Sequence, residues 1–343
     1  MAEMKASYNE KRICLGKNLP LDTPLAILLD VSERCNFRCN YCFRSTEKDW
    51  SWGYAAKNNL MGMEIFQQAV GQLSAFPQRI RSIALSGHGE PLCNPELVSM
   101  VKYLKSSGAV ERIEMHTNAS LLTRESARDI AQAGFSRIVV SLQGLDADTY
   151  RRVCGAKIDW DEFYSNLRIL YENKDPDLWV HIKISEAALN KACYAAEKDC
   201  FCSLFGGIAD SIFVEEVTPL WKSLRMEASG SVNKYGQDTG EVECCPILFY
   251  KMWVAPDGEI YPCTGLPVPM SLGNIKETTL YDAWNGQRRR DFLVDHLRLT
   301  RKSNVTCADC FVPVNTVTME KDRIDSYRSE ILKRLGERGN ILK

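Results

Sequence analysis

Short apolar runs rich in β-branched residues recur between residues 22 and 220, and stretches with apolar residues at helical spacing separate them. A short apolar run bounded by polar residues is typical of a buried strand. Strands that alternate with amphipathic helices indicate βαβ units, a parallel sheet and right-handed crossovers. The pattern therefore predicts six strands, at residues 25–31, 82–87, 112–118, 137–144, 180–185 and 211–217.

Polar or small side chains stand at the carboxyl ends of several of these strands, among them Ser86, His116 and Lys183. In a barrel of parallel strands, this is the edge at which active sites are built. We therefore predict an α/β fold whose core is a partial (β/α)6 barrel of TIM type, with one concave face lined by these residues.

The character of the chain changes near residue 228, where the polar, glycine-rich stretch 228–243 has the composition of a linker. Beyond it the sequence predicts a hairpin, a Cys-x2-Cys turn and a charged helix from residue 320, with so few apolar residues that a bound metal would help them fold. We predict four parts: an N-terminal extension (1–21), the barrel (22–227), a small cysteine-rich domain (228–318) and a C-terminal helix (319–343).

Composition narrows the classes of partner. The 43 basic residues nearly balance the 44 acidic residues, so the strong positive field that binds nucleic acid or an anionic membrane surface is missing. Neither an apolar signal segment nor a run of about 18 apolar residues is present, and we expect a cytoplasmic protein. In a reducing compartment, its 14 cysteines indicate metal or redox chemistry rather than disulfides.

Three cysteines, Cys35, Cys39 and Cys42, follow the first predicted strand on one short loop. A [4Fe-4S] cluster is closed by four thiolates, so three would leave one iron with an open position. A structural zinc site would want a fourth cysteine or histidine nearby, and residues 43–59 offer none. Zinc, or three unligated buried cysteines, are the alternatives.

This Cys-x3-Cys-x2-Cys loop, with Tyr41 before its last cysteine, resembles the signature of the radical S-adenosylmethionine (SAM) superfamily. In that family, SAM chelates the open iron through its amino and carboxylate groups. Reductive cleavage of SAM gives methionine and a 5'-deoxyadenosyl radical, which abstracts a hydrogen atom from carbon. The resemblance covers residues 24–220 and implies that the triplet holds a [4Fe-4S] cluster.

Later strand ends match the same family in order. Residues 87–91, Gly-His-Gly-Glu-Pro, resemble its Gly-Gly-Glu-Pro turn, with His88 in place of the second glycine. A glycine turn lets the backbone approach a ligand, and a carboxylate suits the ammonium of SAM. A lone Asn or Ser at a strand end is more often a cap or turn residue, and the order of the matches is what gives them weight. The resemblance implies a SAM-binding set of Tyr41, Gly87, His88, Gly89, Glu90, Asn118 and Ser141.

A second group of spaced cysteines consists of Cys245, Cys263, Cys307 and Cys310. Four thiolates close a metal site, and a Cys-x2-Cys pair binds one centre from a single turn. The pattern resembles the shortened SPASM domain called the twitch domain, which implies one auxiliary [4Fe-4S] cluster; a zinc ribbon is the alternative. Cys244 lies beside Cys245, and we prefer Cys245 as the ligand because it precedes Pro246, as in the family's opening turn.

The resemblance implies a radical SAM oxidoreductase that abstracts a hydrogen atom from substrate carbon and oxidises or remodels a sugar- or cyclitol-type small molecule. It further implies help from the auxiliary cluster and a flavodoxin- or ferredoxin-type electron donor. We predict that Glu216 accepts a proton from the substrate. Cys202 or Cys244 is a candidate for the thiol that, in radical SAM epimerases, returns a hydrogen atom to the substrate radical.

Two other functions stay open at this point. One is a maturase or epimerase of a ribosomally made peptide. The other is a non-catalytic iron-sulfur or zinc-binding protein, which the match at residues 87–91 disfavours.

Overall fold

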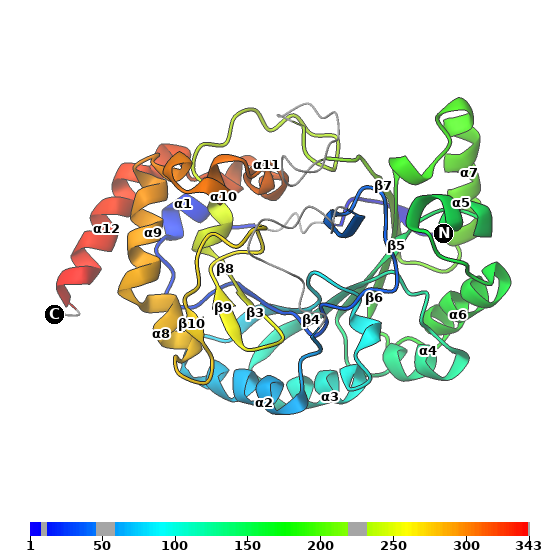
Figure 1. The fold of residues 1–343 in the computed structure, drawn as a ribbon, viewed down its shortest axis with the longest axis horizontal. Helices are drawn as coiled ribbons and strands as arrows, with labels where there is room; N and C mark the ends of the chain where they lie inside the picture. The colour runs from blue at the N-terminus through cyan, green and yellow to red at the C-terminus, as the bar shows by residue number, and fades with distance from the viewer. Residues whose placement is uncertain (8–11, 46–58, 219–231, 342–343) are drawn as a thin grey trace.

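The computed structural model describes residues 1–7, 12–45, 59–218 and 232–341. Six parallel strands curve into an open barrel, each beside its neighbour in sequence (Figure 1). They are β2 (Ala26–Leu29), β3 (Ile80–Leu85), β4 (Val110–Thr117), β5 (Arg137–Leu142), β6 (Trp179–Ser185) and β7 (Ser211–Glu215). Each overlaps one of the apolar runs, so the predicted α/β partial barrel is confirmed.

Helices that connect these strands cover the outer face of the sheet (Figure 1). They are α2 (Met63–Gln72), α3 (Leu97–Ser107), α4 (Arg124–Ala131), α5 (Ala147–Cys154), α6 (Trp160–Glu172) and α7 (Tyr194–Phe205). Because side chains alternate along a strand, Ile27 and Leu29 of β2 are buried in the core against these helices, whereas Leu28 lines the barrel interior. The helical layer thus leaves the inner face of the sheet for a site.

Further strands extend the sheet at both edges. At one edge, β1 (Glu3–Met4) pairs in parallel with β7. At the other, β8 (Lys251–Val254) pairs in parallel with β2, and β9 (Glu259–Tyr261) and β10 (Gly273–Asn274) follow in antiparallel order. The predicted hairpin is therefore present, and its turn needs the positive φ of Gly258 (89°). The cysteine-rich part is built directly onto the sheet of the barrel.

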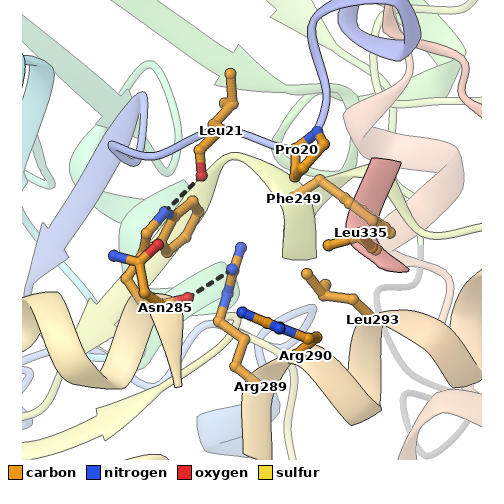
Figure 2. Close-up of a pocket in the computed structure, with 9 residues that line it drawn as sticks. Pro20, Leu21, Phe249, Asn285, Arg289, Arg290, Leu293 and Leu335 are labelled. Atoms are coloured by element: carbon orange, nitrogen blue, oxygen red, sulfur yellow. Dashed lines mark hydrogen bonds between the residues drawn. The ribbon is translucent and has the colours of Figure 1, made fainter. Parts of the chain in front are cut away.

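Most of the remaining helices form a second core with the N-terminal extension. They are α1 (Leu15–Asn18), α9 (Gln287–Leu297), α10 (Val305–Ala308), α11 (Val312–Thr316) and α12 (Arg328–Ile341), whereas α8 (Leu280–Asn285) packs into the main core. At the seam between them, the buried Arg289 donates to the carbonyl oxygens of Trp284 and Leu248. Figure 2 shows Arg289 in the wall of a pocket of about 40 Å³ at this seam. No helix in the described parts is both long and apolar enough to cross a bilayer.

The C-terminal helix begins later than predicted, at Arg328 rather than at residue 320. The carboxylate of Asp322 accepts hydrogen bonds from the backbone N–H groups of Thr318 and Met319 and from Arg12. These bonds fix tight turns that a continuous helix would break.

The predicted linker also differs from expectation. The boundary between residues 227 and 228 lies outside the described residues, but residues 232–243 are not a loose connection. Asn233 is fully buried and its side-chain oxygen accepts from the N–H groups of Tyr235 and Gln237, so its amide shapes a tight turn. That turn directs Lys234 into the barrel, which composition alone did not reveal. The other predicted boundaries stay predictions.

Candidate active site

The cysteine triplet lies on the loop that leaves β2. The N–H of Cys42 donates to the carbonyl of Cys39 (2.9 Å), which curls the loop. A hydrogen bond with Cys154, then burial and the charges of Cys42 and Cys35, raise the pKa of Cys39. Thiols this close and this buried ionise readily only beside a compensating positive centre. This donor set fits an iron-sulfur cluster with one open iron.

The turn at residues 87–91 packs against the same loop. A side chain on Gly89 would lie 2.3 Å from the carbonyl oxygen of Ser32, and one on Gly87 would lie 1.9 Å from the carboxyl carbon of Asp30. Both positions therefore exclude any residue with a Cβ. The resemblance implied that these glycines let the backbone approach SAM. In the structure, they let the turn pack against the segment that leads from β2 to the cysteines.

Glu90 ties this turn to the end of β4. Its buried carboxylate accepts hydrogen bonds from the hydroxyl of Thr117 (2.5 Å) and from the N–H groups of Asn118 (2.7 Å) and Leu92 (3.1 Å). Burial nevertheless raises the pKa of Glu90 to about 7. Glu90 therefore has a positioning role within the protein, and its bond to the amino group of SAM stays a prediction.

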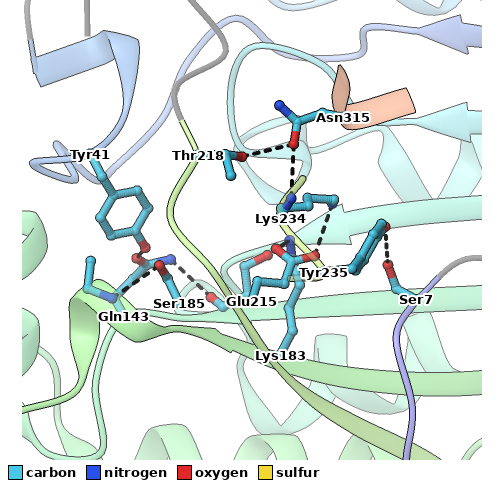
Figure 3. Close-up of polar contacts among 12 residues, drawn as sticks. Ser7, Tyr41, Gln143, Lys183, Ser185, Glu215, Thr218, Lys234, Tyr235 and Asn315 are labelled. Atoms are coloured by element: carbon cyan, nitrogen blue, oxygen red, sulfur yellow. Dashed lines mark hydrogen bonds and ion pairs between the residues drawn. The ribbon is translucent and has the colours of Figure 1, made fainter. Parts of the chain in front are cut away.

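Two other predicted SAM contacts connect the cysteine loop to the sheet. The Asn118 side chain donates to Asn36 (3.0 Å) and accepts from the N–H of Ser120 (2.9 Å), so it shapes a turn beside the triplet. The hydroxyl of Tyr41 donates to the side-chain oxygen of Gln143, which follows β5 (Figure 3). The strand-end pattern predicts Gln143 at the concave face, but only the folded chain brings it to Tyr41.

A cavity of about 590 Å³ opens at the carboxyl edge of the barrel strands. The predicted site residues in its wall are Tyr41, Cys42, Gly87, His88, Ser141 and Glu216. On another side, the wall includes Ile247, Thr264 and Val312, which stand within two positions of Cys245, Cys263 and Cys310 in the sequence. The cavity therefore reaches from the triplet loop to the segments that carry the second cysteine group.

The floor of the cavity holds an ion-paired cluster (Figure 3). Glu215, at the end of β7, lies 2.5 Å from Lys183 of β6 and 3.0 Å from Lys234. Burial alone would raise the pKa of Glu215, but the two ammonium charges outweigh it and hold that pKa well below its usual range. The strand-end pattern predicts Glu215 as well as Glu216 at the concave face, but not the ion pairs of Glu215, because these depend on strand register.

The three candidate catalytic residues occupy different places. Glu216 borders the cavity with an exposed side chain, and its N–H donates to the carbonyl of Lys234 (2.9 Å). Cys202 lies on α7 in the outer layer, packed against the main core. Cys244 is fully buried in the second core. The structure thus brings Glu216 to the cavity, and places neither Cys202 nor Cys244 in its wall.

The four cysteines of the second group come together from three segments. Cys245, Cys263 and Cys307 are buried, and Cys310 is half-buried. Burial, followed by the charges of Cys310, Cys263 and Cys307, raises the pKa of Cys245 well above its usual range. The charges acting on Cys244 come instead from Asp325, Arg328, Arg301 and Glu243. This arrangement supports Cys245 rather than Cys244 as the fourth ligand, and four converging thiols fit a fully ligated cluster.

No three His, Cys, Asp or Glu side chains in the described residues stand close enough to ligate the same single metal ion. The thiols of an iron-sulfur cluster each ligate a different iron, so they need not lie close enough together to share one ion.

His88 links the two cysteine regions. Its ring lies 5.6 Å from that of Phe43, next to Cys42, and 4.5 Å from that of Trp253 in β8. Its Nε2 lies 3.3 Å from the carbonyl oxygen of Thr264, next to Cys263. The departure from the family's glycine thus places a buried ring between the triplet loop and the second cysteine group.

Two family models match the chain. The radical SAM superfamily model matches residues 29–183, which contain the triplet and the turn. The model of an iron-sulfur cluster-binding domain, SPASM, matches residues 244–311, which contain the second cysteine group. Fold and site thus define a barrel protein with two iron-sulfur centres. The chain belongs to the radical SAM superfamily and carries a C-terminal SPASM domain; its cofactors are SAM and [4Fe-4S] clusters, one of them auxiliary.

Curated relatives match part of the barrel. GTP 3',8-cyclase of Crocosphaera subtropica is 33% identical over 147 residues, which are 42% of this chain and 42% of that protein. GTP 3',8-cyclase of Campylobacter lari is 35% identical over 120 residues, 35% of each chain. The matched region spans about two fifths or less of the length of these relatives.

Solved structures share the fold over most of the chain. BtrN in complex with AdoMet and 2-DOIA has a TM-score of 0.53 at 17% identity, covering 83% of this chain and 92% of BtrN. SuiB of Streptococcus suis, bound to the precursor peptide SuiA, has a TM-score of 0.58 at 16% identity, and the match covers 88% of this chain and 72% of SuiB. The protein anSMEcpe with bound AdoMet has a TM-score of 0.57 at 14% identity, and the match covers 93% of this chain and 100% of anSMEcpe. At these identities, the likeness shows the fold alone.

Proposed function

We propose that this protein is a radical SAM oxidoreductase that abstracts a hydrogen atom from a carbon of a sugar- or cyclitol-type small molecule, with help from the auxiliary cluster. The observation that carries the proposal is the cavity, which the triplet loop, the SAM-turn residues and the second cysteine region all line. Its volume of about 590 Å³ lies within the usual range of small-ligand sites.

In the family, bound SAM and its cluster supply a 5'-deoxyadenosyl radical. The protein's own residues hold the reacting molecules and move the proton. Tyr41, through Gln143, fixes the triplet loop to the end of β5, and His88 fixes it to the second cysteine region. The substrate would therefore be oriented between two regions whose positions are coupled by direct contacts.

Once a hydrogen atom has left, oxidation of a hydroxyl carbon also requires acceptors for one electron and one proton. The electron would go to the auxiliary cluster, held by Cys245, Cys263, Cys307 and Cys310. Glu215 is a poor proton acceptor, because two ammonium groups stabilise its carboxylate. Among the described residues, no ion pair holds Glu216, and its exposed carboxylate borders the cavity. We therefore keep Glu216 as the proton acceptor in this proposal.

For Glu216→Gln, we expect substrate oxidation to fall by roughly 10²- to 10⁴-fold, the usual contribution of a general base. Formation of 5'-deoxyadenosine should fall far less, because cleavage of SAM does not use this carboxylate. The measurement is the ratio of product to 5'-deoxyadenosine under anaerobic turnover. Glu111→Gln, an exposed site on β4, is the matched control. An unchanged ratio in Glu216→Gln would remove Glu216 from the mechanism.

The substrate class is tested by deuterium transfer. Reconstituted protein, SAM and reductant are incubated with carbon-deuterated polyols or with peptides, and 5'-deoxyadenosine is analysed by mass spectrometry. Deuterium from a polyol supports the proposal. Deuterium from a peptide alone would favour the maturase alternative, whose fold SuiB shares. If SAM is not cleaved under any condition, the proposed oxidoreductase activity is wrong.

A further inference from the structure

Three lysines line the cavity, and they come from three separate segments. Lys183 lies on β6, Lys234 lies in the turn shaped by Asn233, and Lys251 begins β8. Lys183 and Lys234 share the carboxylate of Glu215. Lys251 makes no side-chain hydrogen bond or ion pair with any of the described residues. The cavity wall therefore holds three ammonium groups against two carboxylates, Glu215 and Glu216, and only Glu215 is ion-paired with lysines among the described residues.

The strand register fixes the direction of Lys251. Lys251 is paired with Ala26 of β2, and Trp253 is paired with Leu28, whose side chain lines the barrel interior. Because side chains two apart share a face of a strand, Lys251 and Trp253 both point inward. The Lys251 side chain is half-buried and ends in the cavity rather than at the outer surface.

The groups near Lys251 do not supply a full counter-charge. Burial lowers the pKa of Lys251, the charges of Cys263 and Glu114 oppose that effect, and the charge of Lys234 adds to it. Glu114 is itself paired with Arg112 (3.6 Å). An ammonium group removed from water is costly unless an anion compensates it.

A histidine in the same wall lies near the same positive charges. His116 opens onto the cavity. Burial, followed by the charges of Lys183 and Lys234, holds the pKa of His116 well below its usual range. A neutral His116 adds no positive charge of its own, and the two lysine charges, which act on its pKa after burial, also favour an anion in the cavity.

We propose that the substrate carries an anionic group, a carboxylate or a phosphate, and that Lys251, with Lys234 beside it, receives this group. The inference rests on the proposed function and narrows its substrate class to acidic or phosphorylated sugars and cyclitols. Carboxylate and phosphate oxygens accept charge-assisted hydrogen bonds from ammonium groups, which gives Lys251 the partner that the protein does not provide.

The test compares charged and neutral members of two matched pairs: glucuronate with glucose, and myo-inositol 1-phosphate with myo-inositol. Binding to the reconstituted, SAM-loaded protein is measured anaerobically by calorimetry. We expect the charged member of at least one pair to bind roughly 10- to 100-fold more tightly, as a charge-assisted hydrogen bond allows. The first pair reports a carboxylate site and the second a phosphate site.

Lys251→Met should remove this preference and leave the neutral compounds unaffected, whereas Lys251→Arg should keep most of it. Lys276→Met, at an exposed lysine after β10, is the matched control and should change nothing. A wild type that binds both members of each pair alike, or binds neither, overturns the proposal. A Lys251→Met variant that keeps the preference for charged compounds also overturns the proposal. If that variant changes only the EPR signal of the auxiliary cluster, Lys251 interacts with the cluster ligand Cys263 instead of the substrate.

Binding does not require cleavage of SAM, so the two proposals fail separately. A chain that prefers the charged compounds but makes no 5'-deoxyadenosine would contradict the proposed reaction and leave the anion site intact. Deuterium transfer from neutral polyols, without any charge preference in binding, would contradict the anion site and leave the reaction intact.

Discussion

Replacing Cys245 by alanine is expected to remove about four irons from the reconstituted protein, the content of one [4Fe-4S] cluster. The reason is that Cys245 interacts with Cys263, Cys307 and Cys310, and three thiols without the fourth leave this buried centre incomplete. Substrate oxidation should be lost with the cluster, while the triplet keeps its own irons. Iron and sulfide analysis with EPR measures both effects.

Cys244→Ala is the matched control, one residue away and equally buried. Its backbone N–H donates to Asp325 (2.9 Å), and this bond does not depend on the thiol. We expect the variant to keep its full iron content. Loss of iron from Cys244→Ala with retention in Cys245→Ala would reverse the ligand assignment.

Glu215→Gln is expected to destabilise the protein by about 3–5 kcal/mol, the cost typical of removing one partner from a buried ion pair. The amide cannot balance Lys183 and Lys234, which would share the cavity floor without a carboxylate. Urea unfolding at pH 7 measures the change in the free energy of unfolding. Glu216→Gln, at the exposed neighbour, should change it far less.

The pH dependence follows from the sign of the Glu215 shift. Because the folded pKa of Glu215 lies below its unfolded value, its carboxylate stabilises the fold above the unfolded pKa and loses that contribution as the pH falls through the folded pKa. The difference between wild type and Glu215→Gln should therefore be constant from pH 6 to 8 and shrink below about pH 4.3, the usual pKa of a glutamate. A difference that grows on acidification would contradict this role.

The sequence predicted the parts of the fold that depend on local patterns. The six barrel strands were recognisable because each is a short segment rich in apolar and β-branched residues, and the triplet because its three cysteines share one loop. The pairing of β8 with β2 could not be recognised in the same way, because the paired residues Lys251 and Ala26 are separated by more than half of the sequence. No spacing rule connects such distant segments.

The candidate site was predictable to a similar extent. Residues 87–91 formed a recognisable turn, but the reason for Gly89 is its contact with the carbonyl of Ser32, which appears only after folding. The ion pairs of Glu215 depend on strand register and on a turn in a segment whose composition indicated a linker. Motifs therefore identified the cysteine groups, and the structure revealed the cavity between them.

The most direct test of this account compares wild type with the triple variant of Cys35, Cys39 and Cys42 to alanine, after anaerobic reconstitution. Iron content and EPR with and without SAM are measured on both proteins. The two-cluster assignment predicts about eight irons in wild type and about four in the variant, as two Cys-ligated four-iron clusters require, with a SAM-responsive signal only in wild type. Bound zinc in place of iron, or a wild-type signal that ignores SAM, would contradict it.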